Sequence, residues 1–160
     1  LKDSTVNTTV ITNALRSGYG DYWRNNINLG SKSELYRTLE VSFRFRNYLL
    51  DIKNIKARCA FTKLRCSAHR LAIEMGRYSR PVTDREARLC MRCGDGSIEN
   101  EEHFLIKCSA LQTQRNQLWA DITAKCPNFP LLGPGAQLIY LLTSEGQLAQ
   151  MVGEFCVDKL

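Results

Sequence analysis

Three cysteines and one histidine follow one another within a segment of nineteen residues. They are Cys90, Cys93, His103 and Cys108, separated by gaps of two, nine and four residues. Three thiolates and one imidazole are ligands that Zn²⁺ takes in a closed tetrahedral site with a structural role. The pattern therefore predicts a zinc ion bound by these four side chains.

A tight turn must present the first two sulfurs to the same ion. Gly94 and Gly96 come directly after Cys93. Glycine is favoured where a turn needs a positive φ or a close approach of the backbone. We therefore expect a knuckle-like turn at Cys90 and Cys93.

A short helix must present the second pair of ligands. Asn100 precedes two acidic residues, and this order is typical of a helix N-terminus with Asn as the N-cap. A helix starting there would carry His103 in its first turn and Cys108 just over one turn later. Both side chains would then lie near the same face.

An alternative interpretation pairs two of these cysteines in a disulfide and leaves His103 as a surface residue. The chain has seven cysteines, an odd number, and we expect no secretory leader; both points argue against a disulfide. Unpaired cysteines in this number favour an intracellular, reducing environment. Cys126 and Cys156 are predicted to be packed thiols, and the sequence assigns no role to Cys59 and Cys66.

The residues around the four ligands carry a family resemblance. Residues 64–78 read LRCSAHRLAIEMGRY, residues 88–90 read RLC, and residues 98–108 read IENEEHFLIKC. Together they resemble the zinc-binding region found C-terminal to the reverse transcriptase in non-LTR (LINE-type) retroelements and in stand-alone relics of such elements. That family shows R-x-S-x-H-x-L-x-I-E-x-G-R-Y, then a Cys pair, then E-x-E-x-H-F-L-x-x-C. The match is strong over about residues 35–117 and weaker toward the C-terminus.

The resemblance implies an accessory domain that holds element RNA or target DNA near a polymerase supplied by an upstream reverse transcriptase domain. The final His-x4-Cys also resembles a retroviral zinc knuckle. Nine residues rather than four precede His103, however, so the tight geometry of that knuckle is not expected here.

Length and composition predict a folded, mostly helical protein. The chain has 160 residues, of which 44% are hydrophobic. We expect residues 1–30 to be a linker or the remnant of an upstream domain, and residues 31–160 to form a helical zinc-binding domain. Within it we expect basic helices over 31–80, a zinc module over 88–109 and C-terminal helices over 110–160. Because the chain begins with Leu, we expect it to be a piece of a longer protein.

Hydrophobic spacing predicts the individual helices. Residues 8–16 could form a short helix, which Gly18 and Gly20 would end. Tyr22 and Trp23 are predicted to pack within the fold, with stacking on nucleic-acid bases as the alternative. A helix over residues 31–52, capped by Ser31 or Ser33, is indicated by apolar residues near helical spacing, namely Leu35, Leu39, Phe43, Phe45 and Leu49. Further helices are predicted over residues 111–125, 136–143 and 145–157.

Basic residues recur every seven positions in residues 53–77. Lys56, Lys63, Arg70 and Arg77 would drift by only about 20° per heptad on a continuous helix and would form one basic stripe. Leu64 and Leu71 would mark its buried side. The candidate nucleic-acid contacts are Lys56, Lys63, Arg65, Arg70, Arg77 and Arg80.

Charge is distributed unevenly along the chain. Residues 1–89 carry a net charge of +9 and residues 90–160 a net charge of −3, and residues 42–80 hold ten Lys or Arg against two acidic residues. A basic half beside a zinc module is typical of a nucleic-acid-binding protein, whose cations contact phosphates. The alternative is a solvated basic face that keeps the domain soluble.

Cys66, His69 and Glu74 are close enough in sequence to raise the question of catalysis. Their spacings do not require them to meet in space. We expect His69 to be buried and hydrogen-bonded, and Glu74 to pair with Arg77 or Arg70, although a zinc-binding role for His69 stays open. The chain has no polymerase aspartate motif, no phosphate-binding glycine loop and no carboxylates paired for two-metal chemistry. We therefore predict no catalytic residue, no enzymatic activity and no small-molecule substrate.

The sequence thus predicts a zinc-stabilised nucleic-acid-binding accessory domain of a retroelement reverse transcriptase. Its expected partners are RNA, DNA or both, and the upstream reverse transcriptase domain. The alternative is a zinc-stapled protein–protein interaction module that binds no nucleic acid. No apolar segment approaches the ~18 residues that a membrane helix needs, so we expect no membrane partner and an intracellular location, nuclear or cytoplasmic.

Overall fold

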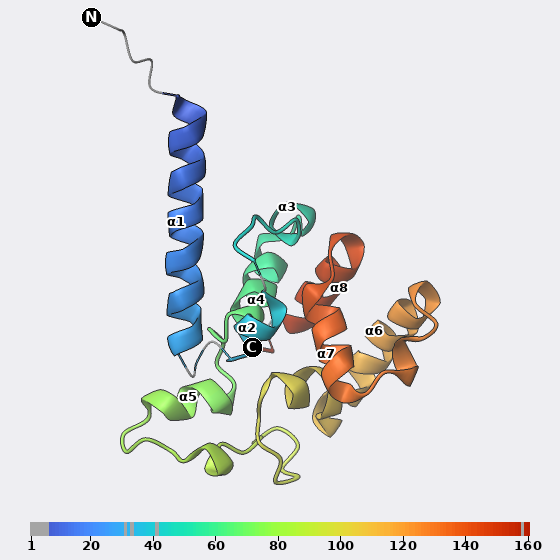
Figure 1. The fold of residues 1–160 in the computed structure, drawn as a ribbon. Coiled ribbons are helices and arrows are strands. Elements are labelled where there is room, and N and C mark those ends of the chain that lie inside the picture. The colour runs from blue at the N-terminus through green and yellow to red at the C-terminus, as the bar shows by residue number, and fades with distance from the viewer. Residues whose placement is uncertain (1–6, 31, 33, 41, 158) are drawn as a thin grey trace, which may run out of the picture. The chain divides into compact units, whose positions relative to one another are not determined.

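The fold is built from helices, with a long, mostly non-helical segment between α5, Ala72–Tyr78, and residue 101 (Figure 1). The computed structural model describes the chain except residues 1–6, 31, 33, 41 and 158. Over the described residues, the one β-type pairing is a single antiparallel bridge between Leu89 and Ile98. The predicted mostly helical fold is confirmed. The chain divides into two compact units, Leu1–Phe45 and Arg46–Leu160.

Helix α1 of the first unit spans Thr8–Leu29 and is continuous. The side chain of Asn7 caps it by accepting a hydrogen bond from the backbone N–H of Thr9 at 3.0 Å. The prediction that Gly18 and Gly20 end a shorter helix was wrong. Each glycine costs a helix about 1 kcal/mol relative to alanine, and the other turns of a helix of 22 residues can offset that cost.

Helix α2 spans Glu34–Leu39 and follows α1 in the same unit. The indole of Trp23 meets the rings of Tyr36 and Phe43 at centroid distances of 6.3 and 5.8 Å, so its predicted packing role is confirmed. The guanidinium of Arg37 donates to the carbonyls of Ile27 and Gly30 at 3.0 and 2.9 Å. Those carbonyls lie at the C-terminal end of α1, where backbone acceptors lack helical partners.

The predicted helix over residues 31–52 is interrupted. The structure has α2 and then α3, which spans Tyr48–Asp51, with non-helical backbone at residue 40 and at residues 42–47. Phe43 and Phe45 are two positions apart, and residues at that spacing point to opposite sides of a helix. The alternating pattern therefore opposes a helix there. The two predicted caps, Ser31 and Ser33, lie outside the described residues.

The second unit is organised around the contact between α4, Ile55–Arg65, and α8, Gly146–Cys156. Asn54 caps α4, and Ala57, Phe61 and Leu64 are fully buried on its inner face. A Cβ atom on Gly153 would lie 2.7 Å from the carbonyl oxygen of Ala57, so the two helices approach closely through a glycine.

The predicted continuous basic helix over residues 53–77 was wrong. Helix α4 ends at Arg65, and α5 spans Ala72–Tyr78. Ser67 lies between them with φ at +48°, a left-handed conformation that stops a helix. The basic residues at intervals of seven therefore do not lie on one helix.

The predicted C-terminal helices are confirmed, with starts shifted by up to two residues. Helix α6 spans Gln112–Lys125 and α7 spans Pro134–Thr143, and both pack against α8. Cys156 is fully buried, as predicted for a packed thiol, and burial raises the pKa of its thiol to about 12. Cys126 is half-buried, whereas Cys59 and Cys66 are exposed. None of the described helices has the length and apolar character needed to cross a bilayer.

Candidate metal centre

The four predicted ligands converge on one point of the second unit. Their ligand atoms all lie within 4.8 Å of one another. The sulfurs of Cys90 and Cys108 are 3.9 Å apart, and the Cys93 sulfur is 3.4 Å from Nε2 of His103. A tetrahedral ion with metal–sulfur bonds of about 2.3 Å would hold two sulfurs about 3.8 Å apart. The donors are therefore spaced for a single metal ion.

A small hairpin presents Cys90 and Cys93. The backbone N–H of Cys90 donates to the carbonyl of Ser97 at 2.8 Å. The N–H of Gly94 turns back to the carbonyl of Cys90 at 3.2 Å. Gly94 and Gly96 have φ values of +65° and +79°, so the predicted need for glycine in this turn is confirmed.

A short helical segment presents His103 and Cys108. Oδ1 of Asn100 accepts a hydrogen bond from the N–H of His103 at 2.8 Å, which confirms Asn100 as the cap of this segment. The N–H of Cys108 then donates to the carbonyl of His103 at 2.7 Å. In an α-helix, residues five apart are separated by about 140° around the axis. This wider i→i+5 turn, a form found often at functional sites, brings both ligands to one face.

Burial favours the protonation state that a metal needs at His103. Cys90, His103 and Cys108 are buried, and Cys93 is half-buried. Desolvation lowers the pKa of His103 below its usual range, although nearby carboxylates oppose that shift. A lower pKa keeps the imidazole neutral, and the neutral imidazole is the ligand form.

Arg115 on α6 places a buried cation next to the cluster. Its Nη2 donates to the carbonyl oxygen of Cys108 at 2.6 Å. Burial lowers the pKa of Arg115, and the charge of Cys108 opposes that shift. Three thiolates and a neutral imidazole around a divalent ion carry a net charge of −1, so a neighbouring guanidinium stabilises the complex.

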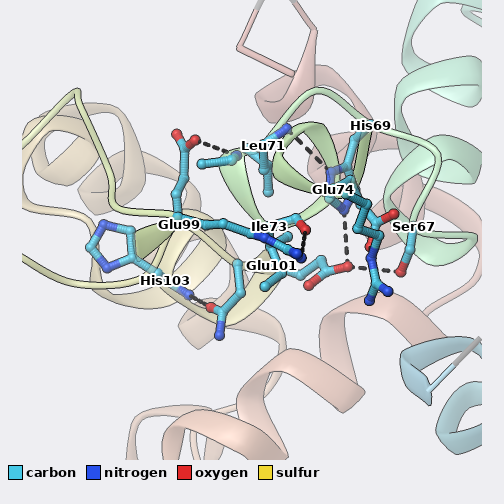
Figure 2. A network of polar contacts seen from close by, with 12 residues as sticks. Ser67, His69, Leu71, Ile73, Glu74, Glu99, Glu101 and His103 are labelled. Atoms are coloured by element: carbon cyan, nitrogen blue, oxygen red, sulfur yellow. Dashed lines mark hydrogen bonds and ion pairs between the residues drawn. The ribbon is translucent and has the colours of Figure 1, made fainter. Parts of the chain in front are cut away.

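The residues that follow the hairpin are hydrogen-bonded to the segment joining α4 to α5 and to the first turn of α5 (Figure 2). One carboxylate oxygen of Glu99 accepts from the N–H of Ala72 at 2.8 Å, and the Glu99 carbonyl accepts from Ile73 at 3.1 Å. Oε1 of Glu101 accepts from the hydroxyl of Ser67 at 2.8 Å and lies 2.9 Å from Nε2 of His69. These contacts fix the metal-binding segment against the helical core.

The carboxyl of Glu101 is suited to this linking position. Burial alone would raise its pKa. The hydrogen bonds from His69 and Ser67 outweigh burial and hold the pKa of Glu101 below its usual range. Glu101 is therefore an ionised acceptor in the network.

His69 belongs to this network and not to the metal cluster. Its Nε2 faces Glu101, and its Nδ1 accepts from the N–H of Leu71 at 3.3 Å, so both ring nitrogens are engaged. The prediction of a buried, hydrogen-bonded histidine is confirmed. Glu74 pairs with Nε of Arg77 at 3.0 Å, also as predicted. Cys66 is exposed, whereas His69 and Glu74 are buried and engaged with other groups.

The six candidate nucleic-acid contacts differ in exposure. Arg77 is half-buried beside Glu74, and Arg65 is buried with its guanidinium 4.8 Å from the ring centre of Tyr48 and 5.7 Å from that of Phe61. A buried arginine in this position serves packing and cannot reach a phosphate. Four side chains are exposed, namely Lys56, Lys63, Arg70 and Arg80.

Sequence reasoning did not assign roles to three residues around the metal site. Glu99 and Glu101 lie in the segment that carries the family resemblance, and their position in that pattern could have suggested a structural role. Arg115 lies seven residues after Cys108. Nothing in its local sequence distinguishes it from an exposed helical arginine, so tertiary structure was needed to find it.

Comparison with known proteins adds no further assignment. No family model, no curated protein and no solved structure matches the chain.

Proposed function

We propose that this protein is a zinc-stabilised nucleic-acid-binding accessory domain of the retroelement reverse transcriptase type. The observation that carries the proposal is the convergence of Cys90, Cys93, His103 and Cys108 on one point. The segment leading to His103 is hydrogen-bonded, through Glu101, to the connector that carries the exposed Arg70. A metal ion at the cluster would therefore hold basic residues in place as well as the hairpin.

Zinc is the metal that best suits this donor set. Thiolates are soft ligands, and a Cys₃His set in tetrahedral spacing is a common structural zinc site. All four positions are filled by protein, so no coordination position stays open for a substrate. The proposed role of the ion is structural.

The proposed ligand is RNA or DNA, bound through its phosphates. The contacts are assigned to the exposed cations Lys56, Lys63, Arg70 and Arg80. Arg65 and Arg77 are not assigned as phosphate contacts, because Arg65 is buried and Arg77 pairs with Glu74. Phosphate contacts release counterions and give an affinity that falls with salt. The polymerase would be supplied by an upstream reverse transcriptase domain inside the cell, and this chain alone should not extend a primer.

Two measurements test the proposal together. Metal analysis should give one zinc per chain, and titration of duplex DNA or RNA against salt should give a steep loss of affinity. Replacing Lys56 and Lys63 by Ala should flatten the slope of log K against log salt by about 2, because each phosphate contact contributes roughly 1. Lys125→Ala on α6 is the matched control and should leave the slope unchanged. A zinc-loaded protein without salt-dependent affinity would rule out the nucleic-acid role.

A protein-interaction module is the second candidate, and helix α1 favours it. None of its residues is buried. Leu15, Tyr22 and Leu29 are seven apart and all exposed, so they form an apolar stripe that a partner helix could cover. A partner bound with an affinity that ignores salt, together with no affinity for RNA or DNA at 50 mM salt, would favour this candidate.

A further inference from the structure

An open pocket of about 500 Å³ lies between α5 and the residues that lead into the metal-binding hairpin. This volume falls in the range of pockets that bind small ligands or parts of larger ones. Apolar and small side chains form most of its lining, to which Arg88 also contributes. None of the four metal ligands lines it. The residues that the argument uses are Met75, Gly76, Tyr78, Thr83, Arg88 and Met91.

Arg88 fixes the shape of this pocket. Its guanidinium donates to the carbonyl of Ile73 at 2.8 Å and, through Nε and Nη2, to the carbonyl of Thr83 at 3.0 and 2.8 Å. A Cβ atom on Gly76 would lie 2.7 Å from the side chain of Arg88, so this crossing requires glycine. The hydrogen bonds of Arg88 therefore hold this part of the lining in place before any ligand binds.

The mouth of the pocket carries large exposed apolar side chains. Tyr78 is 65% exposed, Met75 51% and Met91 90%. Three such side chains around one hollow are typical of a binding site, since isolated surface positions rarely gather in this way. Methionine adapts its shape to flat or irregular ligands.

The charge around the mouth indicates which ligand it suits. Residues 72–92 hold five arginines against three acidic residues, and no lysine occurs between residues 64 and 106. Arg80 and Arg85 are exposed on the loop that contributes Thr83 to the wall. Arginine binds phosphate in a bidentate way and stacks on planar rings. An apolar hollow with an arginine rim suits a ligand that joins flat apolar groups to phosphates.

We propose that this pocket receives an unstacked base of single-stranded RNA or DNA, and that the protein therefore prefers single strands to duplexes. The ring of Tyr78 stacks on the base, and Arg80 and Arg85 contact the adjoining phosphates. Bases in a duplex are stacked and paired, so they cannot enter. This inference rests on the proposed nucleic-acid role and adds the form of the ligand.

The test compares a twelve-nucleotide uridine strand with a duplex of equal length, using fluorescence anisotropy on the zinc-loaded full chain. The wild type should bind the single strand more tightly than the duplex. Tyr78→Ala should weaken single-strand binding about five-fold or more and leave duplex binding unchanged, because stacking is lost and charge is kept. Tyr78→Phe keeps the ring and should bind as the wild type does.

A strand of the same length without bases provides a second measurement. This strand keeps the phosphates but has no base to stack on Tyr78. The wild type should therefore bind it more weakly than the uridine strand. Tyr78→Ala should bind this strand with the same affinity as the wild type. The inference would be overturned if the wild type bound single strand and duplex equally, or if Tyr78→Ala did not weaken single-strand binding. The pocket would then be better explained as a binding site for a peptide. If the wild type showed no salt-dependent binding to any of these strands or to the duplex, the proposed function itself would be overturned.

Discussion

The contact between α4 and α8 and the segment of residues 88–108 are stabilised in different ways. The two helices meet through side chains that are fully buried, such as Phe61 and Val152, and through the close approach at Gly153. The segment 88–108 depends on a turn, a capped helical start and polar links to the connector between α4 and α5. One region is held by apolar packing and the other by directed contacts around a cluster of metal ligands.

This difference determines how each region should respond to a defect. Apolar packing is spread over many contacts, so a single change costs a limited amount. A metal site depends on one ion, and without the ion its ligands have no common partner. The segment 88–108 should therefore lose its structure in one step when the metal is removed, whereas the helical packing should weaken gradually.

Metal removal should produce the largest effect. Chelation is expected to cost several kcal/mol of folding free energy, because binding of a structural zinc contributes directly to folding. Most of the loss should be confined to residues 88–108 and the connector bonded to them. Amide hydrogen exchange should show lost protection at Cys90 and Cys108, with protection retained at Phe61 and Val152. Equal loss of protection in both regions would show that they unfold as one unit.

Thiol labelling provides an independent check of that result. With metal bound, the exposed Cys59 should react first, and Cys66 should react more slowly because burial raises the pKa of its thiol. Chelation should add the three ligand thiols Cys90, Cys93 and Cys108. Cys156 should stay unreactive as long as α4 and α8 remain packed, since burial raises the pKa of its thiol to about 12 and keeps it protonated.

A glycine substitution should disturb the apolar region alone. Gly153→Ala would place a Cβ atom 2.7 Å from the carbonyl oxygen of Ala57, so α8 must shift. We expect a loss of up to about 3 kcal/mol in the free energy of unfolding, measured by urea denaturation, with zinc content unchanged. Gly135→Ala on α7 is the matched control, because its nearest neighbour would lie at an ordinary 3.9 Å. A similar loss in both variants would contradict the close approach as the cause.

The links between the two regions should have an intermediate effect. Glu101→Gln keeps the size of the side chain but removes the charge that faces His69, whose side chain is fully buried. We expect a loss of about 1–1.5 kcal/mol, the difference between a charged and a neutral hydrogen bond, with zinc retained. Glu102→Gln, at the next position and partly exposed, should cost less. A loss of zinc in Glu101→Gln would mean that the network also positions the ligands.

The same contrast explains which features could be predicted from the sequence. The four ligands, the glycine turn and the Asn100 cap are local in sequence, and their chemistry specifies them. The helices α6, α7 and α8 follow from apolar spacing. The break between α4 and α5 could not be predicted from local sequence. It lies at Ser67, which has a left-handed conformation and whose hydroxyl is hydrogen-bonded to Glu101, 34 residues away. A seven-residue repeat of charges gives no indication of such a break.

The burial of individual charged residues also could not be predicted from the sequence. Arg65 and Arg115 are both basic residues on helices. The neighbouring sequence does not distinguish these two buried arginines from exposed residues such as Lys56 or Lys63. Only the tertiary structure shows that one lies against two aromatic rings and the other against the carbonyl of Cys108. A basic pattern therefore predicts net charge well and individual contacts poorly.

Two asparagine N-caps, one in each region, allow the apolar helix contact and the metal-binding segment to be compared by the same substitution. We expect these substitutions to have the smallest effects on stability. Asn54 caps α4 by accepting from the N–H of Lys56 at 2.9 Å, and Asn100 accepts from the N–H of His103 at 2.8 Å. Each change to Ala should cost about 1 kcal/mol of stability, because each leaves a helix N-terminus uncapped. Only Asn100→Ala should also weaken zinc affinity, measured by competition with a chelator, because this cap orients a ligand. If Asn54→Ala weakened zinc affinity equally, the metal site would depend on the stability of the whole unit and the two regions would not be separate.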